Sequence, residues 1–557
     1  MERQEEVKID KYLGALLGAA SGDALGWPNE YNSKNVKRDI PKNKHMFQKW
    51  LRRDGGRFWS HEEEINPGEY SDDTQLIIAT ARSLQYGKNW SKHFTKVELP
   101  AWISYERGGG GATKRAADAW KKGINPWSAS KDKNADVVKY FNAGGNGVAM
   151  RILPHVFRNE QNTEELIHQV VLNGIFTHGH PRALVGATLY ADALICLSNK
   201  TKTLGYGELV STLLQRKDNW GKFPSLQKMD SWLSMADSAL KTKYMDIWDS
   251  VVKEVVRLLE TAQEGLNEGA LDMGSGVLEK LGCFDKNING AGTVTAVASI
   301  YLASKYASSP QLGVVEAAYL KNADTDTLAS MVGGLLGMLH GTEFISGSWM
   351  DVQDYEFLKQ LVHLEQKKDE PSQDNMKDVL DYNNPTFKSR LKQLKPNDTI
   401  SALPFKKLTV KEKRQNKVNT NGALIHTVKL VSEEGQSIFI KTFEKIPEEK
   451  RVLQEQDSNQ QAIPFDQTLA NKAQPYSNGK ALKPFLDANK TRSLANLLPD
   501  KMPSPQCFFF ISDILAELER GETGRIDEKG FMILVDRWKK YSINKWHIER
   551  VLKVILD

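Results

Sequence analysis

The chain has 557 residues, with 75 Lys and Arg against 70 Asp and Glu, which gives a net charge of +5. Its 40% hydrophobic and 26% charged residues exclude a largely disordered or fibrous protein. So small a net charge gives no indication of a nucleic-acid partner or of an anionic membrane surface. The three cysteines, Cys196, Cys283 and Cys507, are far apart, which excludes a disulfide framework and a cysteine-based zinc site. With no apolar signal at the N-terminus and no long apolar run, we expect a cytoplasmic protein without a membrane partner.

The length predicts two to four domains, at roughly 150 residues each. Residues 1–365 contain apolar segments rich in Ala, Leu and Gly, with polar residues at their ends, which predicts the buried helices of a large bundle. Residues 366–415 are polar and punctuated by Pro and Asn, and we interpret them as a linker. Residues 416–557 open with two β-rich runs that predict a hairpin, followed by helical patterns, so we expect a smaller α+β domain of unknown role there. Residues 401–557 carry 26 basic and 20 acidic side chains, a net +6, against −1 for the rest.

The first polar cluster is Gly22-Asp23-Ala-Leu-Gly26-Trp-Pro-Asn-Glu30. We expect the first helix to stop at Gly22 or Gly26, with Asp23 and Glu30 in the loop that follows. Alone, this cluster is best explained as an ordinary helix end.

Two further clusters each open an apolar helix. Ser71-Asp72-Asp73-Thr74 precedes one, and Asp324-Thr325-Asp326-Thr327 precedes the other. A Ser or Asp before a helix is normally an N-cap, but adjacent carboxylates exceed what a cap needs and repel each other. Four carboxylates converging in an apolar bundle would be costly unless cations neutralised them, and hard divalent ions prefer carboxylate and hydroxyl oxygens. Together the clusters predict a site for two metal ions that activates a water.

Glycine-rich loops accompany the acidic clusters. Arg107 is followed by Gly108–Gly111 and a predicted helix, where backbone N–H groups can approach a phosphate. Gly144–Gly147 is a second glycine turn, ending near Arg151. Each loop alone is a weak signal. Thr177-His178-Gly179-His180-Pro181 suggests either a metal site or a hydrogen-bonded helix start, and the helix start is favoured.

In this order the motifs resemble the ADP-ribosylglycohydrolase family, the group that includes the dinitrogenase reductase-activating glycohydrolases. The resemblance covers about residues 9–345. The matching pieces are Gly22-Asp23-x-x-Gly26-x-x-x-Glu30, Ser71-Asp72-Asp73-Thr74, Gly108–Gly111, Gly145-Asn146-Gly147-x-x-Met150-Arg151, Thr177-His178-x-His180-Pro181 and Ala323-Asp324-Thr325-Asp326-Thr327. The paired acidic clusters carry the specificity of this match. The chain departs from the family pattern with Ser71 where Thr is common and with a stiff Trp27-Pro28-Asn29 before Glu30.

The resemblance implies an all-α, roughly orthogonal helix bundle with a central binuclear Mg²⁺ centre, Mn²⁺ being the alternative ion. The implied metal ligands are Ser71, Asp72, Asp73, Asp324, Asp326 and Thr327. Glu30, Asp72 and Asp73 would take part in catalysis, with Glu30 as the mobile carboxylate. Gly109, Gly110, Gly111, Asn146, Gly147 and His178 would bind the substrate.

The implied reaction is hydrolysis of the N- or O-glycosidic bond between ADP-ribose and a modified protein or other ADP-ribosylated substrate, with ADP-ribose as the product. Its transition state would resemble an oxocarbenium ion, which nearby carboxylates stabilise. Two rival hypotheses use the same pocket without catalysis: a module that only binds ADP-ribose, and an immunity or scaffold protein in which the bundle blocks a partner. Release of ADP-ribose that depends on Mg²⁺ separates the enzyme from both.

Overall fold

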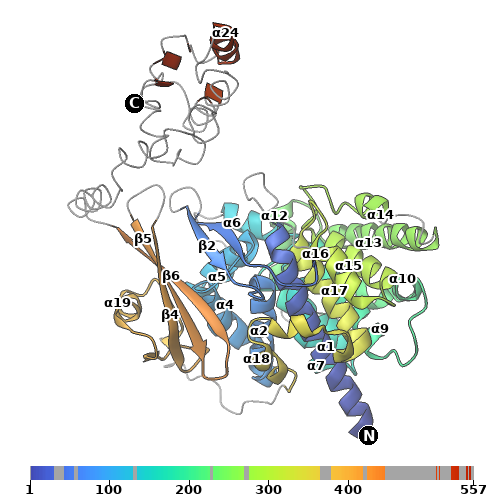
Figure 1. Cartoon of the computed structure of the whole chain (residues 1–557). Helices are drawn as coiled ribbons and strands as arrows, with labels where there is room; N and C mark the ends of the chain where they lie inside the picture. Colours follow the sequence, from blue (N-terminus) through green and yellow to red (C-terminus); the bar gives the residue numbers. More distant parts are fainter. Residues whose placement is uncertain are drawn as a thin grey trace. The chain divides into compact units, whose positions relative to one another are not determined.

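A computed structural model describes residues 2–30, 43–55, 60–128, 134–225, 230–268, 275–363, 378–417 and 423–445, and short stretches between 510 and 552. These residues are mostly helical, with a small sheet region (Figure 1). The helices are α1 Glu2–Glu30, α2 Asp72–Leu84, α3 Trp90–His93, α4 Leu99–Trp102, α5 Gly111–Lys121, α6 Asn134–Phe141, α7 Leu153–Asn159, α8 Thr163–Ile175, α9 Pro181–Ser198, α10 Glu208–Gln215, α11 Lys217–Trp220, α12 Asp230–Leu240, α13 Tyr244–Asn267, α14 Ser275–Lys280, α15 Gly292–Lys305, α16 Pro310–Ala318, α17 Thr325–His340, α18 Tyr355–Gln360, α19 Pro385–Gln393 and α24 Glu528–Arg537. The strands are β1 Trp50–Asp54, β2 His61–Ile65, β3 Thr399–Ile400, β4 Leu408–Lys417, β5 Ala423–Ser432 and β6 Ser437–Lys445. No helix of this part of the chain is long and apolar enough to span a membrane.

The centre of the bundle is the antiparallel contact between α1 and α17, which run side by side (Figure 1). Glycines on one face of α1 allow the two backbones to touch. A Cβ built on Gly22 would lie 2.1 Å from the Ala329 carbonyl oxygen, and one on Gly26 would lie 2.1 Å from that of Thr325. Such distances are too short for any side chain, so only glycine permits this approach.

The expected end of the first helix at Gly22 or Gly26 is wrong, because α1 continues to Glu30. The glycines at these positions serve close packing and do not terminate the helix. Asp23 therefore lies inside α1, and Glu30 at its last residue.

The buried apolar residues form two main clusters. The larger surrounds α1, α9, α15 and α17. The second joins α2 and α4 to the sheet, and its members include Leu76, Trp102, Leu408, Leu430 and Ile440. The sheet therefore shares a core with the helices that precede it.

The four-stranded antiparallel sheet has the order β3-β4-β5-β6. The predicted hairpin is confirmed as β5 and β6, whose register pairs Val431 with Ser437 at the turn. A second hairpin, β1–β2, was not expected, because its strands are short and carry several charged residues.

The structure divides the chain into two compact units, Met1–Lys445 and Ile446–Asp557. This division lies later than the predicted 366–415 linker. Residues 378–415 contain α19 and most of β4, and Leu391 and Val410 are buried there, while 364–377 lie outside the described residues. The polar composition of this stretch reflects its exposed positions, and its few apolar residues pack inward. In the second unit, described residues include α24 and the ring pair Phe510–Trp538.

We predict that Gly22→Val destabilises the protein by about 3 kcal/mol or more, because the new side chain collides with the backbone of α17. Gly347→Ala is the matched control, since a Cβ at Gly347 meets open space. Urea unfolding of both variants measures the difference. Equal stability of the two would contradict the proposed close approach.

Candidate metal centre and active site

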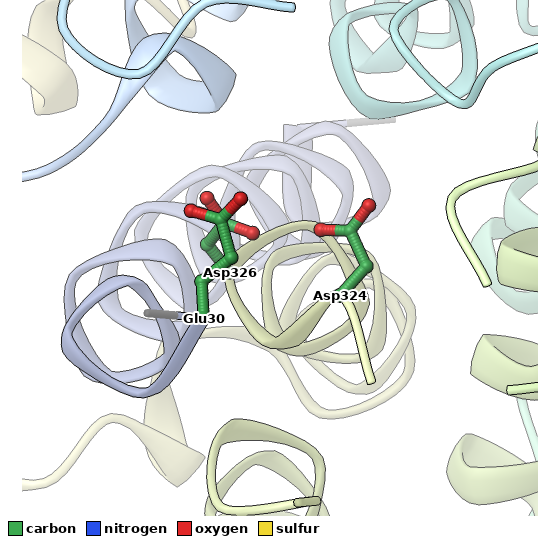
Figure 2. A group of neighbouring side chains, drawn as sticks. All are labelled: Glu30, Asp324 and Asp326. Atoms are coloured by element: carbon green, nitrogen blue, oxygen red, sulfur yellow. The ribbon is translucent and has the colours of Figure 1, made fainter. Parts of the chain in front are cut away.

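Three helix ends bring the predicted acidic residues together. α1 ends at Glu30, α2 begins after Ser71, and α17 begins after Asp324. The carboxylates of Glu30, Asp324 and Asp326 each offer an oxygen within 4.8 Å of the others. Figure 2 shows these three carboxylates pointing the same way, one from the end of α1 and two from the start of α17. The α1–α17 packing thus determines where they meet.

The α2 cluster adjoins the α17 cluster directly. The Thr327 hydroxyl donates to Asp73 Oδ2 at 3.3 Å. The other oxygen of Asp73, Oδ1, is buried and has no hydrogen-bond partner among the described residues. Ser71 is the N-cap of α2, with its Oγ accepting from the Asp73 N–H, so the cap interpretation of this residue is confirmed.

Burial and mutual repulsion raise the pKa values of three aspartates in this group. Burial, followed by repulsion from Glu106, raises the pKa of Asp72 well above its ordinary value. Burial and repulsion from Asp23 do the same to the pKa of Asp73, and burial and repulsion from Glu30 to that of Asp326. So many carboxylates with hard oxygen donors and an unpartnered buried oxygen form a set that fits divalent cations.

Glu30 is the exposed member of the group that it forms with Asp324 and Asp326. Although the residue as a whole is exposed, loss of hydration around its carboxylate and repulsion from Asp324 raise the pKa of Glu30 to about 8, against an opposing effect of Arg52. A carboxyl group with such a pKa exchanges its proton near neutral pH, as a general acid or base requires.

Asp23 is a residue of the site that the sequence analysis left in a loop. It is fully buried, and its carboxylate accepts hydrogen bonds from the Ser71 N–H at 3.0 Å and from the Thr74 N–H and hydroxyl at 3.0 and 2.6 Å. Asp23 therefore fixes the start of α2 against α1. In the sequence it stands in the motif Gly22-Asp23-x-x-Gly26-x-x-x-Glu30, as a charged residue inside an apolar, glycine-rich segment.

The loop before α5 borders the acidic group. A Cβ on Gly108 would lie 3.1 Å from Asp72 Oδ1 and 3.3 Å from Trp27 Nε1. The Gly109 N–H donates to Glu106, which also pairs with Lys114. Glu106 is a second acidic neighbour that the sequence analysis missed.

The first residues of α5 leave room for a ligand. Gly110 precedes the helix, and a Cβ there would meet open space. Gly111 lies next to the Arg115 guanidinium, which would be 3.1 Å from a Cβ. Free N–H groups and a nearby cation make this end of α5 suited to an anion.

The loop at 144–147 also contacts the acidic group. Asn146 Nδ2 donates to Asp324 Oδ2 at 2.9 Å and to the Thr295 hydroxyl at 3.1 Å. Gly147 packs against the His178 ring, which would be 3.0 Å from a Cβ. His180 caps α9 by accepting from the Arg182 N–H, which confirms the helix-start interpretation of this histidine.

The sheet reaches the site through Arg107, which is buried. Its guanidinium pairs with Glu69 at 2.8 Å and with Glu63 of β2 at 3.2 Å, and lies over the ring of Phe439 in β6 at 4.1 Å. Lys441 of β6 pairs with Glu63 at 2.6 Å. Thus the strand pair β1–β2 and the sheet together hold the residue that precedes Gly108.

Comparison with known proteins adds three findings. A family model described as ADP-ribosylglycohydrolase matches residues 4–374. The ADP-ribosyl-[dinitrogen reductase] glycohydrolase of Rhodospirillum rubrum is 28% identical over 177 residues, which are 31% of this chain and 52% of that protein. The match thus spans about half the length of this relative. A solved chain titled ADP-ribosylglycohydrolase-related protein complex aligns over 65% of this chain and 98% of its own, with 19% identity and a TM-score of 0.40.

We predict that the metal-free protein becomes less stable as pH rises from about 5 to 8.5. The folded state keeps protons on Glu30 and the buried aspartates that the unfolded state releases near pH 4 to 4.5, so stability is lost as pH rises through the folded pKa values. Thermal unfolding in a chelator, at several pH values, measures the slope. Asp73→Asn should flatten it, whereas Asp249→Asn, exposed on α13, should not. If the wild-type protein in chelator became more stable as pH rose, the proposed repulsion among these carboxyl groups would be contradicted.

Proposed function

The chain belongs to the ADP-ribosylglycohydrolase family, and from this we propose that it is a metal-dependent hydrolase that cleaves the N- or O-glycosidic bond between ADP-ribose and a modified target, releasing ADP-ribose. The observation that carries the proposal is the convergence of acidic residues from three helix ends, among them Asp73, whose buried Oδ1 has no hydrogen-bond partner among the described residues. An ADP-ribosylated protein is the proposed substrate, by analogy with the name of the Rhodospirillum rubrum relative.

Two Mg²⁺ ions, with Mn²⁺ as the alternative, are the proposed cofactors. Their ligands would be Ser71, Asp72, Asp73, Asp324, Asp326 and Thr327, which contribute carboxylate and hydroxyl oxygens of the kind these ions prefer. When bound, the ions supply Lewis acidity and electrostatic stabilisation of the transition state.

Within this site, each of the chain's own groups has a proposed role. Glu30 would hold or move a proton at the glycosidic bond or at the attacking water, since its carboxylate lies beside those of Asp324 and Asp326 and is not among the proposed metal ligands. Asp72 and Asp73 would stabilise the positive charge that develops on the ribose. Asn146 would keep Asp324 oriented through its 2.9 Å hydrogen bond while its loop lines the pocket.

The remaining predicted residues would bind the substrate. Gly109, Gly110 and Gly111 lie where α5 begins, and the open space at Gly110 leaves room for a diphosphate. Gly147 and His178, which lie beside Thr113 of α5, would contact the ADP-ribosyl group as well.

We predict that the protein releases ADP-ribose from at least one member of a panel of ADP-ribosylated arginine, serine, cysteine and nucleic acid, and that chelation abolishes release. Asp326→Asn should remove activity, because it removes a metal ligand. Glu30→Gln should lower kcat about a hundredfold with little change in KM. Asp249→Asn is the control and should remain fully active.

Chromatographic detection of ADP-ribose measures the outcome. Tight ADP-ribose binding without release from any substrate would identify the protein as a binding module. Release that persists in the chelator or in Asp326→Asn would refute the metal-dependent mechanism.

A further inference from the structure

Arg151 is a fully buried cation beneath the candidate site. Among the described residues no carboxylate pairs with it, and all of its hydrogen bonds go to neutral oxygens. It donates to Asn173 Oδ1 at 2.8 Å, to the Gly147 carbonyl at 2.8 Å and to the Thr177 hydroxyl at 2.8 Å. A buried charge without a counter-ion is costly, and here these hydrogen bonds and the ring of Phe94, 5.4 Å from the guanidinium, offset that cost.

The contact with Thr177 takes up one of the two lone pairs of that hydroxyl. A guanidinium only donates, so Thr177 Oγ1 must accept from Arg151. Its own proton can then go to His178 Nδ1 at 2.7 Å or to the Gly174 carbonyl at 3.4 Å. A histidine that instead donated from Nδ1 would fill the second lone pair of the hydroxyl and leave its proton only the 3.4 Å contact with the Gly174 carbonyl, at the outer limit of a hydrogen bond. The arrangement in which Nδ1 of His178 accepts therefore gives the hydroxyl proton the better partner.

The state of His178 follows from this assignment. Burial, with repulsion from Arg151 and Arg115, lowers the pKa of His178 to about 3, so the ring is neutral. A neutral imidazole that accepts at Nδ1 carries its proton on Nε2. Nε2 lies beside the 144–147 loop, 3.3 Å from a Cβ placed on Gly147 and 4.0 Å from one on Gly145.

We infer that Arg151 and Thr177 are positioning residues that hold His178 as the Nε2–H tautomer, so that it presents a neutral N–H donor to an acceptor oxygen of the bound ADP-ribosyl group. This inference rests on the proposed function for the identity of the ligand. The same guanidinium also holds the Gly147 carbonyl, so one residue sets both the histidine donor and the loop beside it. A histidine left free to change tautomer would present a lone pair to the substrate oxygen for part of the time and repel it.

The test is ¹⁵N NMR of the full chain, labelled on histidine and free of metal and substrate. Couplings of the ring nitrogens to the carbon-bound protons identify the tautomer, and His178→Asn identifies the signals of this residue. We expect an unprotonated Nδ1 and a protonated Nε2. Thr177→Val should abolish this preference, whereas Thr177→Ser keeps the hydroxyl and should preserve it.

Calorimetric titration with ADP-ribose in the presence of Mg²⁺ supplies a second readout. Thr177→Val should weaken binding about tenfold, the effect of losing one well-placed hydrogen bond, and Thr177→Ser should restore it. Thr188→Val is the matched control, because it removes another buried hydroxyl, bonded to the Val185 and Trp220 carbonyls of the bundle. It should leave both the tautomer and the affinity unchanged.

A protonated Nδ1 in the wild type overturns the inference, as does an unchanged tautomer in Thr177→Val. The wild-type spectrum decides even where Thr177→Val fails to fold. Failure of the proposed function has a different result: the expected tautomer is present, yet no ADP-ribosylated substrate is cleaved.

Discussion

The contact between the backbones of α1 and α17 is the constraint on which the candidate site depends. Glycines at positions such as 22 and 26 allow carbonyl oxygens of α17 to lie where a Cβ would be. Because the helices run antiparallel at this distance, the last residue of α1 meets the first turn of α17. Glu30 and Asp326 are thereby brought together, although 296 positions separate them in the chain. Wider helix spacing would separate the carboxylates.

This packing holds together carboxyl groups that would repel one another if all of them were ionised. The carboxylate of Asp23 accepts hydrogen bonds from the N–H groups at the start of α2. These bonds hold Asp72 and Asp73 beside the α17 cluster. The raised pKa values of these residues express the cost of that arrangement, and a protein tolerates such a cost mainly at functional sites. The bundle thus stores unfavourable electrostatics that bound cations would relieve.

Much of the site could be predicted because its signals are local. Two acidic residues before an apolar helix are more than an N-cap requires, and this excess is visible in the sequence. The length of α1 could not be predicted, because the sequence does not distinguish a glycine that permits close helix packing from one that ends a helix. The packing of the sheet against the helices could not be predicted from the sequence either. It depends on long-range pairs such as Arg107–Phe439 and on a few buried side chains in a stretch whose composition is polar. Asp23 could be identified as part of a motif, but its role could not be predicted, because its partners Ser71 and Thr74 are brought to it only by tertiary packing.

Anomalous diffraction from crystals soaked in Mn²⁺ tests the central claim most directly. We predict two peaks between the start of α2 and the start of α17, one within bonding distance of Asp73 and one within bonding distance of Asp326. The absence of any peak among these carboxylates, in crystals of protein that releases ADP-ribose, would contradict it.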